Sequence, residues 1–455
     1  MPNFHSKVSG REAITPTSYD ISSVRLFIGD KTNSIEIKDI IASITIKESI
    51  YSSSIEVDIR IIDGVNLFEL SRIVGGEEVH LKLFRIIDPT IKFKDSKNKF
   101  DIKVNVASIV DHNKKDIGVQ LYTLKCYSNH TFVSSLKKIN RSFQGVPNAL
   151  VTDICKKDLA FKDSTVFTNK NTNEIKGIYP NLKPLEAINW ILRNCSGEDN
   201  TPLFFYETIQ NGLQFNSYSE LLDQESYMTY NDKAFNDAPS NKETYDAAAT
   251  KIRRMSSPLD MSVYDMINSG VFSSNTQTVD IATKSYENTS FKFKGKSNLN
   301  GFKPFADIIE FDNTTLIDST KSKEFFINVN SKAFGDVATG GFNNYHNPLK
   351  GLLGDKQSCV NALNFMTLNL LLNGDFNLVS GSLVNLKIIR TGDSNEIRNS
   401  EKAFSGKYLV TGVIHSFGED EYVSNVILQK DSMLYNVSEN PNINSVNDNK
   451  ILTNV

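Results

Sequence analysis

The chain has 455 residues, of which 39% are hydrophobic and 23% are charged, and its formal net charge is −3. That length exceeds what one hydrophobic core usually serves, so about two to four domains are expected, and the apolar content excludes wholesale disorder. The balance of 50 basic and 53 acidic residues excludes a general basic surface for nucleic acid, and the sequence shows neither an apolar run of ~20 residues that could span a membrane nor a signal-peptide pattern.

Residues 15–128 are predicted to form a first β domain. In residues 55–61 (IEVDIRI), β-branched side chains alternate with charged ones, which places an apolar row on one face of a strand and charges on the other. Residues 100–106 (FDIKVNV) repeat the pattern, and glycines at Asp63-Gly64 and Gly75-Gly76 favour turns. Five or six short antiparallel strands of this kind predict a small barrel or sandwich.

Residues 129–223 are predicted to form a mixed α+β module. Apolar residues recur at helical spacing in 131–143 and 148–161, and a further helix is expected over 184–195, where Pro184 suits a first helical turn. A hairpin is expected next, with strands at 204–208 and 213–218 around Asn211-Gly212.

Residues 224–360 are polar and are predicted to hold an insertion and the start of a second β domain. A helix is expected over 241–255 and an extended stretch over 291–297, whereas the Gly- and Asn-rich part of 301–360 is expected to be a long loop. Residues 361–435 contain clear strands of the second β domain, and the Asn- and Ser-rich tail, 436–455, is predicted to be disordered.

An internal repeat links the two strand-rich regions. The pattern of residues 79–85 recurs at 384–390, and each stretch follows a glycine, Gly76 or Gly381. A strand closed by a turn precedes each stretch, and each is followed by a strand that ends in His112 or His415 and by a last strand. We therefore expect two copies of one β domain. The alternative, that two antiparallel meanders resemble each other by chance, stays open at this point.

The sequence offers no convincing active site, so no catalytic, cofactor-binding or metal-binding residue is predicted. The four cysteines lack metal-ligand or redox spacing, and Cys126 and Cys155 are expected to be buried. The histidines form no zinc motif, and His112 and His415 are expected to pack or to hydrogen-bond. Trp190 is expected in a core. The GKS at 295–297 lacks the earlier glycine of a phosphate-binding loop and indicates a turn.

Three stretches, 51–85, 182–221 and 381–390 with 405–432, resemble in their order the baseplate hub (tail-tube initiator) proteins of contractile-tailed phages, which are related to the hub part of type VI secretion spike proteins. The resemblance spans most of the chain except residues 224–360 and the tail. It implies a mainly β, α+β fold, in which two similar antiparallel β-barrel tube domains flank the mixed α+β module and a polar insertion interrupts the chain.

The resemblance also implies a structural role without enzymatic activity or cofactor. Such hubs resemble homotrimers that form a pseudo-sixfold ring between the spike and the tail tube, through which the genome passes. The implied partners are the tail spike, tail tube, baseplate wedge and tape-measure proteins, together with viral DNA that passes without specific binding. The implied location is the tail baseplate of the virion, after assembly in the host cytoplasm. A peptidoglycan-degrading enzyme and a tail adhesin or carbohydrate-binding module remain the alternatives.

Overall fold

A computed structural model describes residues 17–434, except 30–32, 86–98, 117, 162–166, 168–173, 198–199, 233–247, 260–261, 282–283, 294–298, 301–309, 312–313, 317, 319–321, 330–333, 337–347, 390–400 and 420. The predicted tail, 436–455, and the GKS at 295–297 lie outside the described residues. Among the described helices, none is long and apolar enough to cross a membrane.

The first strand set comprises six strands whose alternating apolar side chains build one core. They are β1 (Tyr19–Ile28), β3 (Ile41–Ser49), β4 (Glu56–Asp63), β5 (Glu78–Arg85), β6 (Lys99–Asp116) and β7 (Val119–Ser128). Val57, Ile59 and Ile61 of β4 are fully buried, as the alternation predicts. Three short elements complete this part of the chain: β2 (Asn33–Glu36), the 3-10 helix η1 (Lys38–Ile40) and α1 (Leu67–Ser71).

The α+β module follows, and it has its own apolar core. Its elements are α2 (Asn129–Ser135), β8 (Ser142–Gly145), α3 (Pro147–Lys157), β9 (Ile175–Ile178), α4 (Pro184–Asn194), β10 (Leu203–Thr208), β11 (Gly212–Ser217) and α5 (Tyr218–Leu222). The predicted hairpin is confirmed as β10–β11. The helical expectation for 131–143 is wrong beyond Ser135, because residues 142–145 form a strand that pairs with β9.

The second strand set comprises β12 (Ser226–Asn231), β13 (Ile252–Leu259), β20 (Met366–Asn373), β21 (Leu383–Lys387), β22 (Gly406–Phe417) and β23 (Tyr422–Lys430). The predicted helix at 241–255 lies outside the described residues over 241–247, and it is wrong in its last residues, because Ile252–Leu259 pairs with β20 as a strand. Pairing with a distant strand here overrides the local tendency to form a helix.

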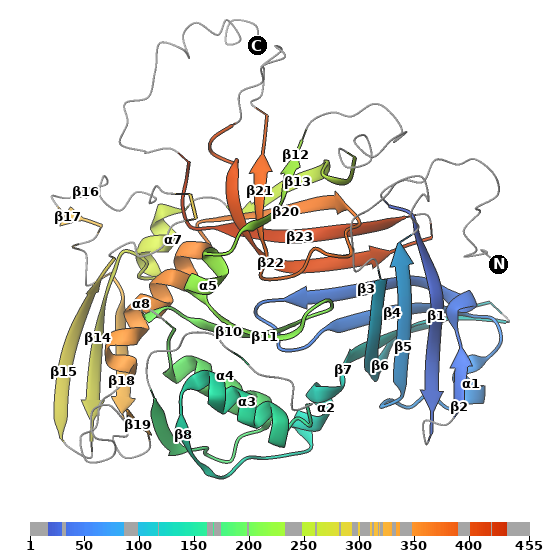
Figure 1. The fold of residues 1–455 in the computed structure, drawn as a ribbon, viewed down its shortest axis with the longest axis horizontal. Helices are drawn as coiled ribbons and strands as arrows, with labels where there is room; N and C mark the ends of the chain where they lie inside the picture. The colour runs from blue at the N-terminus through green and yellow to red at the C-terminus, as the bar shows by residue number, and fades with distance from the viewer. Residues whose placement is uncertain are drawn as a thin grey trace, which may run out of the picture.

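A long segment separates β13 from β20. It contains α7 (Val263–Asn268), β14 (Ser273–Asp280), β15 (Ser285–Lys292), β16 (Glu310–Phe311), β17 (Thr314–Thr315), β18 (Glu324–Val329), β19 (Phe334–Asp336) and α8 (Pro348–Leu363). The long loop expected for the Gly- and Asn-rich stretch 334–351 is wrong at both ends, because residues 334–336 form β19 and residues 348–351 begin α8, whereas residues 337–347 lie outside the described residues. Helix α8 packs against β14 and β15. Strands β15, β14 and β18 form a small sheet, and Figure 1 shows this sheet and α8 beside the α+β module.

The two strand sets share one strand order. The spatial order is β3-β4-β7-β6-β5-β1 in the first set and β13-β20-β23-β22-β21-β12 in the second. If the six strands of each set are numbered along the chain, both sets have the same spatial order, 2-3-6-5-4-1. All neighbouring pairs are antiparallel except β12 and β21, which are parallel. The internal repeat seen in the sequence is thus matched by strand order.

Fine details of the backbone also recur in the two sets. Gly76 donates its N–H to the carbonyl of Val106 at 2.7 Å, and Gly381 donates to the carbonyl of Val410 at 2.8 Å. Both glycines have a positive φ, at 92° and 86°. A register shift interrupts the β6–β7 ladder after Val106 and the β22–β23 ladder after Val410. These shared irregularities are specific to the two strand sets and do not follow from meander topology alone.

The strand sets join into one continuous sheet of thirteen strands through the pairing of β22 with β3. Figure 1 shows them side by side, with the α+β module packed below. The described strands form no closed barrel, so the expectation of two barrels is not confirmed. What the structure shows is a mainly β fold built on a large, predominantly antiparallel sheet.

Candidate functional site at the strand-set junction

The junction between the strand sets lies along one edge of β22. Residues 412–417 of β22 pair antiparallel with residues 44–49 of β3. Residues 406–409 of β22 pair with β21 of their own set. One edge of β22 is therefore divided between the two sets, and this division fixes how the sets are joined.

Glu48 of β3 is a buried carboxylate at this junction, with 3% of its surface exposed. It accepts the backbone N–H of Ile209, in the β10–β11 hairpin, at 2.9 Å and that of Ser380, in the β20–β21 connection, at 2.6 Å. Burial raises the pKa of Glu48 to about 7; the two backbone hydrogen bonds oppose the rise and the charge of Glu207 adds to it. One side chain thus ties the first strand set to the hairpin and to the second set.

Glu207 of β10 makes the corresponding contacts on the side of the first strand set. Its Oε2 accepts the backbone N–H of Ile55 at 3.1 Å and the hydroxyl hydrogen of Ser128. The hairpin is consequently held on both sides by carboxylate contacts, which orient the α+β module against the sheet.

An aromatic cluster fills the junction beside these polar contacts. Phe417 and Tyr422 stack with ring centroids 4.3 Å apart, and Phe376 lies 4.5 Å from Phe100 of the first set. None of the four is more than 1% exposed. Aromatic rings from both sets therefore share one core, and burial of their large apolar surfaces stabilises the junction.

The two repeat-related histidines lie in different surroundings. His415 is fully buried, its Nδ1 is 2.8 Å from the Tyr422 hydroxyl, and burial lowers its pKa to about 3, so it is neutral near pH 7. His112 is exposed, although its Nε2 lies 3.0 Å from Oε1 of Gln120 and its ring lies near Phe68. Packing and hydrogen bonding, as predicted, account for both.

A buried lysine, Lys356, joins α8 to the α+β module. Its ammonium donates to the carbonyls of Leu192, at 2.8 Å, and Arg193, at 3.0 Å, and also to that of Cys195, all at the C-terminal end of α4. Burial lowers its pKa to about 8. A cation at a helix C-terminus satisfies carbonyls that have no partner within the helix.

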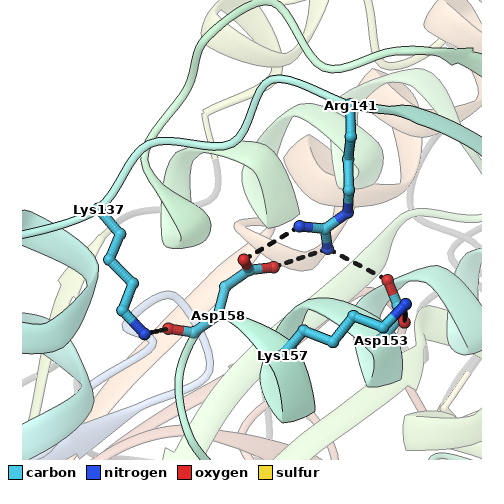
Figure 2. A network of polar contacts seen from close by, with 5 residues as sticks. All are labelled: Lys137, Arg141, Asp153, Lys157 and Asp158. Atoms are coloured by element: carbon cyan, nitrogen blue, oxygen red, sulfur yellow. Dashed lines mark hydrogen bonds and ion pairs between the residues drawn. The ribbon is translucent and has the colours of Figure 1, made fainter.

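Within the α+β module, Arg141 connects two acidic residues of the α3 region. Figure 2 shows its guanidinium between Asp158, reached at 3.0 and 2.7 Å, and Asp153, reached at 3.1 Å. Lys157 approaches Asp153 at 2.6 Å, and Lys137 donates to the Asp158 carbonyl at 2.8 Å. The hydrogen bond with Asp158 is the main cause of a raised Arg141 pKa. The network fixes the end of α3 and is structural.

Metal-ligating side chains and thiols are two kinds of group on which a reactive centre could be built. No group of three or more His, Cys, Asp or Glu among them could hold a metal ion. Cys126, Cys155 and Cys195 are buried and free, and burial raises the pKa of each thiol, which leaves them protonated. Trp190 packs partly buried against the module core near Phe143, as predicted. That the chain lacks catalytic residues stays a prediction.

A small polar cavity of about 160 Å³ lies between the β10–β11 hairpin and residues 379–382. Tyr206, Asn216 and Gln224 are among the residues that line it. This cavity, Glu48, and the capping role of Lys356 were not predicted from the sequence, because each depends on residues more than a hundred positions apart along the chain.

Comparison with solved structures identifies the fold. The 43 kDa tail protein of prophage MuSo2 from Shewanella oneidensis matches with a TM-score of 0.50 and 9% identity, over 90% of this chain and 98% of that one. The chain has a phage tail-protein fold. A tail protein from Neisseria meningitidis matches with a TM-score of 0.48 and 12% identity, over 91% of this chain and 97% of that one.

An E. coli component of the type VI secretion system, described as similar to the T4 bacteriophage tail proteins gp27 and gp5, matches with a TM-score of 0.45 and 9% identity, over 92% of this chain and 78% of that one. None of these three proteins is described as an enzyme. No family model matches the sequence, and no curated protein sequence matches it significantly. The resemblance found in the sequence is thus confirmed by the tail-protein fold.

Proposed function

We propose that this chain is a structural virion protein, the central baseplate hub of a contractile phage tail. The observation that carries the proposal is the pair of strand sets, which share one strand order and are joined within a single sheet. The tail-protein fold supports the same reading. Buried contacts at the junction, such as Glu48 with Ser380, hold the two strand sets together.

The two strand sets act as two tube domains, and three chains form the hub. Each chain contributes two similar units, so a threefold ring of chains presents six such units around its axis. A ring of this kind matches a threefold spike on one side and a sixfold tail tube on the other. The shared strand order is what makes the units similar enough to alternate around a pseudo-sixfold ring.

The partners of the hub are its own second and third copies, the spike, the tube protein, the wedge proteins and the tape-measure protein. Viral DNA passes through the lumen of the ring during ejection. The net charge of −3 supports a conduit, because a lumen densely lined with Lys and Arg would retain the phosphate backbone. The protein is assembled in the host cytoplasm and resides in the tail baseplate.

Immunogold labelling of intact virions tests the location. Antibodies raised against the purified chain are expected to label the centre of the baseplate in particles opened at the tail tip. Labelling of tail fibres would contradict the proposal and favour an adhesin. Clearing of a peptidoglycan gel by the purified chain would also contradict it, since that activity belongs to a cell-wall enzyme.

A further inference from the structure

The first strand set presents an edge that corresponds to the junction edge of the second. In β22, residues 406–409 pair with β21 and residues 412–417 pair with β3. In β6, the strand at the same place in the first set, residues 99–105 pair with β5. Beyond residue 105, no described strand pairs with that side of β6, although β6 continues to Asp116.

Residues along the β22 edge are buried, whereas residues along the β6 edge are exposed, as expected where no neighbouring strand is present. Gly412, Val413 and His415 of β22 are buried, and they lie in the part of the strand that pairs with β3. On β6, residues 107–108 and 111–114 are exposed. A long, exposed edge is a ready template for another strand, and soluble proteins ordinarily shield one. The unshielded part of β6 is therefore a candidate for pairing between molecules.

The second strand set presents the complementary edge. β13 holds the place in the second set that β3 holds in the first, and β13 pairs with β20 on one side only. No described strand pairs with the outer side of β13. One described bridge, between Asn231 at the end of β12 and Lys251, lies just before β13 begins. Residues 253–257 are exposed, whereas Ile44, Ile46 and Glu48 of β3 are buried.

We propose that residues 108–116 of β6 in one chain pair antiparallel with β13 of a second copy, repeating between chains the β22–β3 junction found within the chain. This inference rests on the proposed ring and names the surface through which its chains meet. The two edges are different parts of the chain, so the contact is heterologous. In the proposed assembly, three such contacts close three chains into a ring. Pro258 has no N–H to donate, so the donors of the β13 edge lie within residues 252–256.

Addition of a strand at each edge would extend one sheet through successive chains. Main-chain hydrogen bonds supply the affinity in such strand addition, and alternate side chains supply the specificity. Within the chain, the equivalent junction also buries aromatic rings and Glu48, so the interchain contact is expected to bury the exposed side chains of both edges. His112 would then become buried in the assembly, as His415 already is within the chain.

Disulfide cross-linking between engineered cysteines tests the pairing. Asn113→Cys on β6 and Ser256→Cys on β13 alter exposed side chains, and the native Cys126, Cys155 and Cys195 are buried. A chain that carries both substitutions is expected to give covalent dimers and trimers under mild oxidation. A mixture of the two single variants should give covalent dimers only, which shows that the bond forms between chains.

Two controls accompany the test. The oxidised wild-type chain sets the background of Cys359, which is partly exposed. The pair Asn113→Cys with Leu136→Cys uses another exposed position, just after α2, where Leu136 is 84% exposed, and should remain monomeric on the gel. The partner position is also scanned with Arg254→Cys, because a neighbouring register would move the contact along β13.

The outcomes separate this inference from the proposed function. A trimeric mass in solution without cross-links at either β13 position would overturn the edge pairing and leave the ring intact. A monomeric mass, both alone and with the spike protein, would overturn both. A trimeric mass with cross-links confined to the β6–β13 pairs supports both.

Discussion

The carboxylate of Glu48 accepts the backbone N–H of Ser380 at 2.6 Å, although the two residues lie 332 positions apart in the chain. The same carboxylate accepts the N–H of Ile209 at 2.9 Å. The first strand set, the hairpin of the α+β module and the second strand set thus meet at one buried side chain. The stability of the whole chain should therefore depend on it.

Replacement of Glu48 by alanine is expected to lower the free energy of unfolding by about 3 kcal/mol, because it leaves two buried backbone N–H groups without an acceptor. Glu48→Gln keeps one acceptor oxygen and should cost about half as much. Glu225→Ala removes an exposed carboxylate and should change stability by less than about 0.5 kcal/mol. Urea unfolding followed by circular dichroism measures all three. Equal effects of Glu48→Ala and Glu225→Ala would show that the junction contributes nothing.

The pH dependence of stability should carry the signature of Glu48. Its pKa is raised from about 4.5 to about 7 in the folded chain. Between these values the folded state holds a proton that the unfolded state has released, so the free energy of unfolding falls as pH rises from about 4.5 to about 7. The fall attributable to this group is about 3 kcal/mol. Glu48→Gln cannot titrate and should lack that part of the slope. Parallel pH profiles for the two proteins would refute the assignment.

The repeat-related glycines Gly76 and Gly381 offer a matched pair of alanine substitutions. Both have a positive φ, so each alanine costs about 1–2 kcal/mol of backbone strain. At Gly76 a new Cβ would meet nothing within 4 Å, whereas at Gly381 it would lie 2.2 Å from the hydroxyl of the buried Tyr206. Gly381→Ala should therefore be clearly more destabilising in thermal unfolding. A larger effect of Gly76→Ala would contradict the structure of the junction.

The helix end capped by Lys356 provides a further test of how the parts are joined. Lys356→Met keeps much of the volume but removes the donor shared by three carbonyls at the end of α4. We expect a loss of about 2 kcal/mol in the free energy of unfolding. Amide hydrogen exchange should accelerate in α4 and in residues 355–363 more than in β3 and β4. Uniform or absent acceleration would mean that the cap does not couple α8 to the module.

The sequence predicted those elements whose pattern is local. Residues 55–61 alternate because one face of β4 is buried, and residues 184–194 begin with Pro184 and carry an apolar stripe, so both were correctly predicted. The first residues of β13, 252–255, were mistaken for the end of a helix because the strand lies at the outer side of its sheet. Its residues 253–257 are exposed on both faces, and no alternation marks them.

Helix α8 was missed for a different reason. Gly351 and Gly354 weaken its local helical propensity. A Cβ at Gly354 would lie 2.6 Å from Cβ of Phe291, so the glycine is required by the close packing of α8 on β15. The contacts of Glu48 and Lys356 likewise depend on the assembled fold. The repeat could be predicted from the sequence, but the way in which the two strand sets join could not.

The mass of the particle in solution tests the central claim most directly. Multi-angle light scattering is performed on the purified 51.0 kDa chain alone and after co-expression with the spike protein encoded in the same genome. The hub account predicts three copies of the chain in the particle, on its own or with the spike. A chain that remains a monomer in the presence of its spike partner would contradict it.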